Sequence, residues 1–406
     1  MTRILKTTLI ATAVAFSLSS PLMAAEVASV GEARQEAARH LATLVNDAAF
    51  NDALQGQLHR NQAMLADVLR DYVPKDAQAG EAVKDELRDL DRQAIRYRGL
   101  DGAVLSLLDV HVSGTGDQPL ADTRGVWTAT VVKNPVTRQE ELVAYDDRGA
   151  EHRYPVDAAP DVPMLVVEST NAAALSAGMR VMNESLRKGG LQSEAAPQVT
   201  SRIGGLAAPQ EHVSVLTDIY LTDDREPNTA GDAEIFAIIS GVSPEGKAEI
   251  INVNMPWLDH DKRWYEPAQD FITWRSFGAN YVNVQLFEDD GDFNYKELTK
   301  AVVSAVGDVS LVISPGAPYA LISAGLAKIA NTIIEVMPGK WFQNSADYID
   351  SFYMLERDSH FTRSNPKVGA RGWARIGLKP KVITGPEPKA YADKSMGNGK
   401  PDKSNP

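Results

Sequence analysis

The chain has 406 residues, a formal charge of −13 at neutral pH and no cysteine. Without cysteine it forms no disulfide, no thiolate metal site and no thiol nucleophile. A balance this acidic argues against nucleic acid as a partner, because phosphate binding needs clustered Lys and Arg side chains. The length is typical of two or three domains with enough apolar residues for a sizeable core.

The first 25 residues are typical of a secretory signal. Arg3 and Lys6 precede an apolar stretch at residues 9–18, and small residues follow at Ala24 and Ala25. Such a stretch is too short to span a bilayer. Cleavage after it would remove Arg3 and Lys6 and take the formal charge from −13 to −15. We therefore expect an exported protein, located in the periplasm or outside the cell.

Residues 26–98 show helical periodicity. Apolar side chains recur at steps of three and four within residues 41–48, 64–72 and 83–94. Pro74 and Gly80 interrupt the pattern. Charged side chains occupy the opposite faces, so the pattern predicts a helical region that packs against the rest of the protein.

Residues 99–170 change to a period of two, which predicts a small β-domain. Strand patterns occupy residues 104–112 and 126–132, and two further ones flank the turn residues 146–149. Residues 164–167 read as a short buried strand. Residues 171–209 combine a short helical run with glycine pairs and Pro197, and we predict a linker there.

Residues 210–385 predict an antiparallel β-sandwich, because several short alternating strands are joined by turns. Helical patterns at 295–306 and 317–336 interrupt it, which predicts an insertion at about residues 295–343. Residues 386–406 lack apolar periodicity and predict a disordered tail. The expected fold class is α+β: a helical N-terminal region, a small β-domain, and a C-terminal sandwich with a helical insertion.

Two acidic loops lie within the predicted sandwich, at residues 222–232 and 287–292, and each follows a strand pattern. A sandwich would bring both loops to one end. Two carboxylates about 4 Å apart repel by about 4 kcal/mol at an effective dielectric near 20. A hard divalent cation offsets this repulsion, and ligands that are all oxygen atoms favour calcium.

The order of these aspartates resembles the C-two domain, a calcium-dependent phospholipid-binding β-sandwich. The resemblance covers about 150 residues and depends on four phrases: Asp224, Gly231-Asp232-Ala233-Glu234-Ile235-Phe236, Asp290-Gly291-Asp292 and Asp347-Tyr348-Ile349-Asp350. It departs from the family where a proline is missing, where Asp350 replaces a glycine, and where about fifty residues interrupt the third loop. The ligands that it implies are Asp223, Asp224, Asp232, Asp290, Asp292 and Asp347, with Glu234 and Glu288 in reserve.

Two alternatives stay open for this segment. The Asp-x-Asp pair is either Glu288 with Asp290 or Asp290 with Asp292, and acidic loops are also common as plain solvated turns. The apolar helix at 317–336 either packs as core or enters lipid, with calcium bridging to anionic headgroups. Lys328 and the prolines around this helix argue against a membrane span.

Signatures of catalysis are absent from the sequence. It contains no His-Glu-x-x-His, no Gly-x-Ser-x-Gly, no phosphate loop and no dinucleotide fingerprint, and no two of its seven histidines have metal-ligand spacing. Trp257, Trp264 and Trp274 lie close together in the sequence. They either fill the core or cap a loop, or they form a surface that stacks on sugars or lines a peptide groove.

We therefore predict no catalytic residues. The expected function is that of a non-catalytic, exported calcium-binding module, with an anionic membrane surface or a protein as its partner. The alternative is a secreted hydrolase of unrecognised class that uses the clustered carboxylates. The layout as a whole also resembles an uncharacterised, exported bacterial family of unknown function, and this second resemblance implies no activity.

Overall fold

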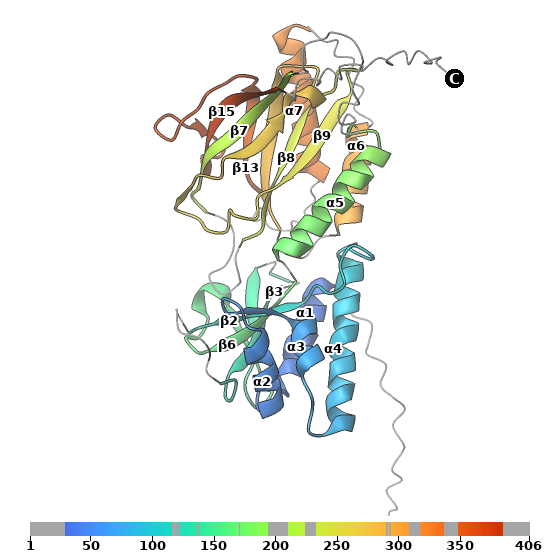
Figure 1. Ribbon diagram of the computed structural model, residues 1–406, viewed down its shortest axis with the longest axis vertical. Coiled ribbons are helices and arrows are strands. Elements are labelled where there is room, and N and C mark those ends of the chain that lie inside the picture. The colour runs from blue at the N-terminus through green and yellow to red at the C-terminus, as the bar shows by residue number, and fades with distance from the viewer. Residues whose placement is uncertain are drawn as a thin grey trace, which may run out of the picture.

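The computed structural model describes residues 29–115, 120, 122–134, 136–137, 139–169, 171–193, 210–223, 233–289, 291, 294–307, 317–336 and 348–384. The predicted signal segment and the predicted tail lie outside these residues, as do residues 194–209 of the predicted linker. Within the described ranges the protein is mixed α+β, with helices first and a β-rich C-terminal region, as the sequence predicts (Figure 1).

The N-terminal half is a helical layer on a mixed sheet (Figure 1). The helices are α1 (Val30–Ala42), α2 (Ala48–Gln57), α3 (Leu65–Asp71) and α4 (Ala77–Tyr97). The strands are β1 (Gln62–Met64), β2 (Asp109–Ser113), β3 (Trp127–Lys133), β4 (Glu140–Tyr145), β5 (Glu151–Pro155) and β6 (Met164–Glu168), in the order β1-β2-β6-β3-β4-β5. The β3–β6 pair is parallel and the other pairs are antiparallel.

Capping side chains set where these helices begin. The Ser29 hydroxyl accepts the N–H of Glu32, and the Asp76 carboxylate accepts the N–H groups of Gln78 and Ala79. Each cap satisfies donors that the first turn of a helix leaves unpaired. Short polar residues at these positions therefore define the starts of α1 and α4.

Strand β1 lies inside the region for which the sequence predicts only helix. Arg60 and Asn61 have φ values of 51° and 64°, and this left-handed turn sends Gln62–Met64 back along β2. Three residues are too few to show a period of two against the helical patterns on either side. The left-handed turn at Arg60 and Asn61 therefore places a short strand between two helices.

The predicted linker contains a long helix, α5 (Ala172–Lys188). The Asn171 side chain caps it by accepting the N–H of Ala174. Its buried residues include Leu175, Met179, Met182 and Leu186, spaced at three and four. This apolar stripe packs against β9 and α6, so most of the described part of the segment is a packed element.

The C-terminal half contains two antiparallel sheets that face each other. One is built from β7 (Gln210–Leu221), β10 (Trp264–Tyr265), β11 (Gln269–Thr273), β14 (Lys367–Val368) and β15 (Ala374–Thr384). The other is β13-β12-β8-β9, from β13 (Tyr348–Glu356), β12 (Tyr281–Glu288), β8 (Ile235–Val242) and β9 (Ala248–Asn254). An apolar cluster with residues from both sheets, such as Ile219 and Ile376 from one and Ile239 and Val284 from the other, fills the space between them.

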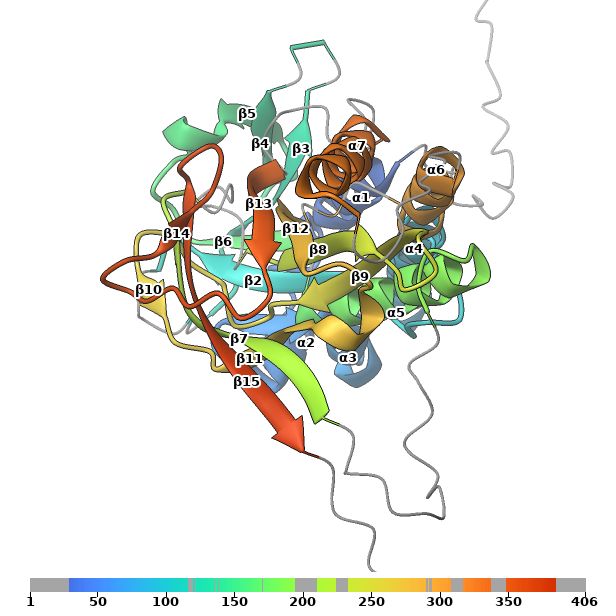
Figure 2. The same cartoon turned by 90° about the horizontal axis from the view of Figure 1, so that it is seen from above.

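Helices α6 (Tyr295–Gly307) and α7 (Tyr319–Val336) follow β12 in the chain, as the predicted insertion requires. With α5 they cover the outer face of the β13-β12-β8-β9 sheet (Figure 2). Ile322, Leu326, Ile329 and Ile333 of α7 are buried, which confirms that this helix packs as core. No helix in the described ranges has the length and apolar character that a bilayer crossing requires.

One apolar core joins the two halves. It includes Leu41 and Leu90 from the N-terminal helices and continues through Leu298 and Leu326 of α6 and α7. The two halves therefore share buried surface, in addition to the chain that connects them.

Candidate functional site

Three strand ends meet at one edge of the β13-β12-β8-β9 sheet. The register pairs Phe287 near the end of β12 with Phe236 at the start of β8 and with Tyr348 at the start of β13. The second acidic loop continues from β12 at this edge, and the first acidic loop leads into β8 there. Asp347 immediately precedes β13. All three acidic segments therefore attach to the same end of one sheet.

The end of β7 lies close to the same edge. Leu221 pairs with Ala374, and the N–H of Thr222 donates to the Trp373 carbonyl oxygen at 2.7 Å. The Asp350 carboxylate of β13 accepts the N–H groups of both Trp373 and Ala374. We call this end of the sandwich the rim; it comprises the ends of β7 and β12 and the starts of β8, β13 and β15.

The predicted ligands divide into two groups. Asp223 and Glu234 are half-buried at the rim, and Glu288 is buried. The other five lie outside the described residues: Asp224, Asp232, Asp290, Asp292 and Asp347. Across the described part of the chain, no three His, Asp or Glu side chains are grouped so that they could hold a metal ion.

A buried ion pair at the rim holds Asp289, the residue after β12. Nη1 and Nη2 of Arg98 lie 2.7 and 2.6 Å from its two carboxylate oxygens, and both side chains are at most 1% exposed. The Tyr295 hydroxyl also donates to this carboxylate. Burial is the largest cause that raises the pKa of Tyr295 well above its usual value, and the negative charge of Asp289 is the second. The Tyr295 hydroxyl therefore remains a neutral donor.

This ion pair joins segments 191 residues apart in the sequence. Arg98 follows α4, and its carbonyl oxygen accepts the N–H of Tyr295 at 3.0 Å. Gly99 has a φ of 69°, and a Cβ there would lie 2.3 Å from Oδ1 of Asn294. The bidentate geometry and full burial assign Asp289, a neighbour of the predicted ligands, a structural role. Nothing in the spacing of the sequence indicates this long-range contact.

Asp350 connects β13 to the turn that precedes β15. Its carboxylate accepts the backbone N–H groups of Ser351, Arg371, Trp373 and Ala374 at 2.8–2.9 Å. A Cβ at Gly369 would lie 2.2 Å from Asp350 Oδ2, so the turn requires glycine there. Asp350 stands where the C-two phrase has a glycine, and here its carboxylate holds the turn in place.

A second buried cluster contains two acids on neighbouring strands. Asp109 of β2 lies directly opposite Glu168 of β6, and the two residues are 2% and 6% exposed. Burial is the largest cause that raises the pKa of Asp109 well above its usual value, and the negative charge of Glu168 is the second. Gln62 donates to Asp109 at 3.1 Å, and Nδ1 of His111 lies 3.2 Å from Glu168 Oε2.

This acid pair has the chemistry expected of the hydrolase alternative, since burial and a neighbouring acid separate two carboxyl groups in pKa. Its position argues against that use. Both acids are almost completely buried in the sheet, so a substrate does not reach them. We assign the pair to the interior of the fold.

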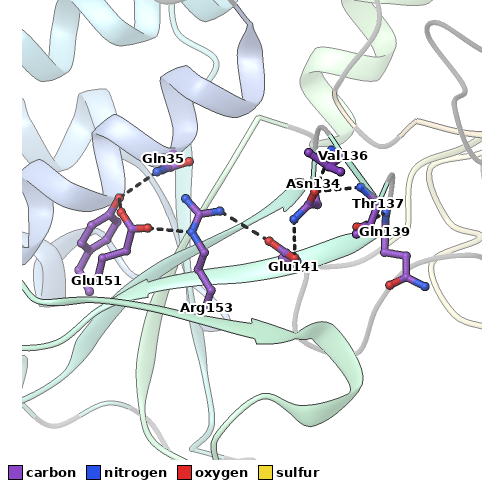
Figure 3. A network of polar contacts seen from close by, with 9 residues as sticks. Gln35, Asn134, Val136, Thr137, Gln139, Glu141, Glu151 and Arg153 are labelled. Atoms are coloured by element: carbon purple, nitrogen blue, oxygen red, sulfur yellow. Dashed lines mark hydrogen bonds and ion pairs between the residues drawn. The ribbon is translucent and has the colours of Figure 1, made fainter.

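A polar network links α1 to strands β4 and β5 (Figure 3). Gln35 donates to the Tyr145 hydroxyl at 3.2 Å, and Nε of Arg153 donates to Glu151 at 2.8 Å. The network continues through Glu141 to Asn134, whose amide donates to Glu141 at 2.6 Å (Figure 3). The Tyr145 hydroxyl donates to Glu151 at 3.3 Å, but burial raises the pKa of Tyr145, so the hydroxyl stays neutral and the network supports the sheet.

The three clustered tryptophans have different surroundings. Trp274 is buried in the sandwich core and donates to Ser214 Oγ at 2.9 Å. Trp257 is half-buried and donates to Gln269 at 3.1 Å. Trp264 lies on edge strand β10 beside Tyr220, with ring centroids 5.4 Å apart. The core interpretation therefore holds for Trp274, whereas Trp264 belongs to a surface.

The protein is therefore of the α+β class: an N-terminal sheet covered by helices is joined to a C-terminal β-sandwich that carries the rim. The profile of a family described as protein of unknown function (DUF3103) matches residues 34–386. The chain belongs to that family, in agreement with the predicted resemblance to an uncharacterised family. Neither a curated protein nor a solved structure matches the chain.

Proposed function

We propose that this protein is an exported, non-catalytic binding protein that takes up calcium at the rim of its sandwich. The observation that supports the proposal is the register of β12, which places Phe287 opposite both Phe236 and Tyr348. That register attaches the three acidic segments of the sequence to one edge. Export rests on the signal pattern of the first 25 residues.

The charge balance at the rim also supports a cation. Arg98 neutralises Asp289, and backbone N–H groups satisfy Asp350, so both of these acids already have partners. The five aspartates of the predicted ligand set that lie outside the described residues add up to five negative charges on the same three segments. Hard oxygen ligands of this kind select calcium over transition metals.

The expected affinity is weak, with a Kd of about 10⁻⁴ to 10⁻³ M, as in extracellular calcium modules. At 10 mM calcium this corresponds to about 10 to 100 times the Kd. Binding to the folded state alone would then stabilise it by about 1.4 to 2.7 kcal/mol. We expect calcium to raise the melting temperature of the mature protein, and a chelator to reverse the rise.

The ligand assignment is tested by the double variant Asp232→Asn with Asp290→Asn, which should no longer respond to calcium. The matched control is Asp85→Asn with Asp89→Asn, which removes two exposed carboxylates on α4 and should respond like the wild type. A calcium response that persists in the rim variant contradicts the assignment. Loss of the response in both variants would indicate a general charge effect in place of a site.

The partner of a calcium-loaded rim is either an anionic membrane surface or a protein. Burial of the apolar stripe of α7 leaves Tyr319 and Leu321, each 58% exposed, on its outer side. Two exposed residues offer little surface for insertion into lipid, so we favour a protein partner. Co-sedimentation with phosphatidylserine vesicles at millimolar calcium tests this preference, and calcium-dependent binding to them would reverse it.

A further inference from the structure

The outer face of the β7-containing sheet carries a row of aromatic and arginine side chains. Ile219 of β7 and Ile376 of β15 face the sandwich core, so Tyr220 and Arg375, their neighbours along the strands, face outward. The register places Trp264 opposite Tyr220 on one side and Arg375 opposite Tyr220 on the other. We call Trp264, Tyr220, Arg375 and the adjoining Arg363 the outer row.

Close contacts order the side chains of the outer row. The Trp264 and Tyr220 rings are 5.4 Å apart and inclined at 44°. The guanidinium of Arg363 lies 5.2 Å from the centre of the Trp264 ring, and that of Arg375 lies 5.4 Å from the centre of the Tyr220 ring. Helices α5, α6 and α7 lie on the opposite side of the sandwich, as Figure 2 shows. The two rings are therefore only partly covered and are held between cations.

The chain segment that supplies Arg363 and Arg375 is basic, although the acids Asp218 and Glu266 from other segments also lie at the outer row. Residues 357–384 contain seven Lys and Arg residues and one acid, Asp358, whereas the chain as a whole carries −13. In the described part of the chain, Arg375 contacts no carboxylate. Arg363 pairs with Glu266 at 3.1 Å, but both side chains are more than half exposed, so the pair is weak.

Besides Glu266, a second carboxylate lies next to the outer row and belongs to the sheet itself. Asp218 lies two residues before Tyr220 and accepts a hydrogen bond from the Thr217 hydroxyl at 2.8 Å. Gly377, directly opposite Asp218, has no side chain that would cover it. The surface therefore combines flat rings, cations and hydrogen-bond acceptors.

We propose that the outer row binds an acidic polysaccharide. Sugar rings present apolar faces that stack on Trp264 and Tyr220. The carboxylates of the sugar reach Arg363 and Arg375, whose planar guanidinium groups suit them, and Asp218 accepts bonds from hydroxyl groups. A net charge of −13 disfavours nucleic acid, which carries a denser row of charges. Both rings are half-buried on the sheet, which disfavours insertion into a membrane surface.

The test measures binding of oligogalacturonate to the mature protein by titration calorimetry, in a chelator so that calcium plays no part. We expect binding that weakens as sodium chloride is raised, because the contacts are exposed ion pairs. Trp264→Ala and Arg375→Ala should each weaken it about tenfold, which corresponds to ~1.4 kcal/mol. A neutral dextran should bind at least tenfold more weakly than oligogalacturonate.

Two matched controls separate the surface from general effects. Tyr319→Ala removes an exposed aromatic ring from α7, and Arg88→Ala removes an exposed arginine from α4, and both should bind like the wild type. The proposal is overturned if oligogalacturonate does not bind, if dextran binds equally well, or if the row variants bind normally. It is also overturned if single-stranded DNA or phosphatidylglycerol vesicles bind through the row while oligogalacturonate does not. Because the titration is run in a chelator, failure of the proposed calcium site leaves its outcome unchanged.

Discussion

Buried charges in this protein are held by different means at different residues. Asp350 is surrounded by four backbone N–H donors, whereas Asp109 faces another acid, Glu168. Hydrogen bonds to a charged acceptor contribute about 1.5 to 3 kcal/mol each. A like charge beside a buried acid instead favours its protonated form. An aspartate therefore stabilises the fold at position 350, whereas at position 109 its ionisation at higher pH destabilises the fold.

Asp109→Asn should make the protein more stable than the wild type at pH 8, because the variant loses a group whose ionised form the fold disfavours. The pKa of Asp109 is raised in the folded state, so the folded protein holds a proton that the unfolded chain releases above pH 4 or so. Wild-type stability from this group is fully present at low pH and decreases as pH rises toward the folded pKa. The amide keeps an oxygen that accepts from Gln62.

The measurement is urea unfolding of both proteins at several pH values between 4 and 8. The wild-type free energy of unfolding should fall relative to that of the variant across this range. Asp85→Asn, at an exposed carboxylate on α4, is the matched control and should leave the pH dependence unchanged. Parallel profiles for wild type and Asp109→Asn would show that Asp109 is ionised in the folded protein.

At the scale of elements, α7 shows how an apolar helix is divided between core and solvent. Leu326 is completely buried against the sandwich, whereas Leu321 is 58% exposed on the same helix. The buried stripe recurs at steps of three and four, which is the spacing of one helix face. The sequence of α7 was also compatible with a helix that enters lipid. Which face of α7 is buried is determined by the sheet against which the helix packs.

Leu326→Ala should destabilise the protein by about 2 to 5 kcal/mol, because it removes buried apolar atoms and leaves a cavity. Leu321→Ala, the same substitution on the exposed side, should change the free energy of unfolding by less than about 0.5 kcal/mol. Chemical denaturation of the two variants measures both values. Equal losses would contradict the packing of α7 described here.

At the scale of the whole molecule, the two halves are joined by a shared apolar core and by the buried ion pair of Arg98 and Asp289. The core includes side chains from α1 and α4 as well as from α6 and α7. Arg98 from the N-terminal half meets Asp289 and Tyr295 from the C-terminal half. Because surface is buried between the halves, unfolding of one exposes apolar atoms of the other, and we expect them to unfold together.

Arg98→Met should reduce the free energy of unfolding by about 3 to 5 kcal/mol, since it leaves Asp289 charged and unpaired in the interior. Calorimetry should show one transition for the wild type and two for the variant, as the junction loosens before the halves unfold. Replacing both partners, Arg98→Met with Asp289→Leu, should recover part of the loss. Arg88→Met, which removes an exposed arginine of α4, should leave the single transition intact. A wild type that already unfolds in two steps would contradict this coupling.

Much of the element pattern was predictable, because alternation and helical spacing are local properties. Residues 126–132 and 164–167 read as strands, and β3 and β6 occupy those positions. The length of α5 was underestimated because glycines after it resemble a linker. Strand β1 was not predicted from the sequence. Its three residues adopt the strand conformation because a left-handed turn precedes them and because they pair with β2, and neither cause produces a periodic pattern in the sequence.

The candidate site shows the limit of sequence reasoning more sharply. Two acidic loops and a third aspartate suggested convergence, and the strand register gives their attachment points a common edge. Yet Asp289, in the second acidic loop, is held by Arg98, and Asp350, next to the third predicted segment, is held by backbone N–H groups. Neighbouring acids in a sequence look alike, because what separates them is the partner that each meets after folding.

By itself the sequence determined the α+β class, the order of most helices and strands, and the acidic balance, since these depend on residue type and short spacing. Only the tertiary structure decided which acids are buried, which side of α7 faces the sheet, and that Trp264 and Arg375 stand in one row. Those properties depend on contacts between residues tens to hundreds of positions apart. Such contacts are set by how sheets and helices pack, and they leave no pattern along the chain.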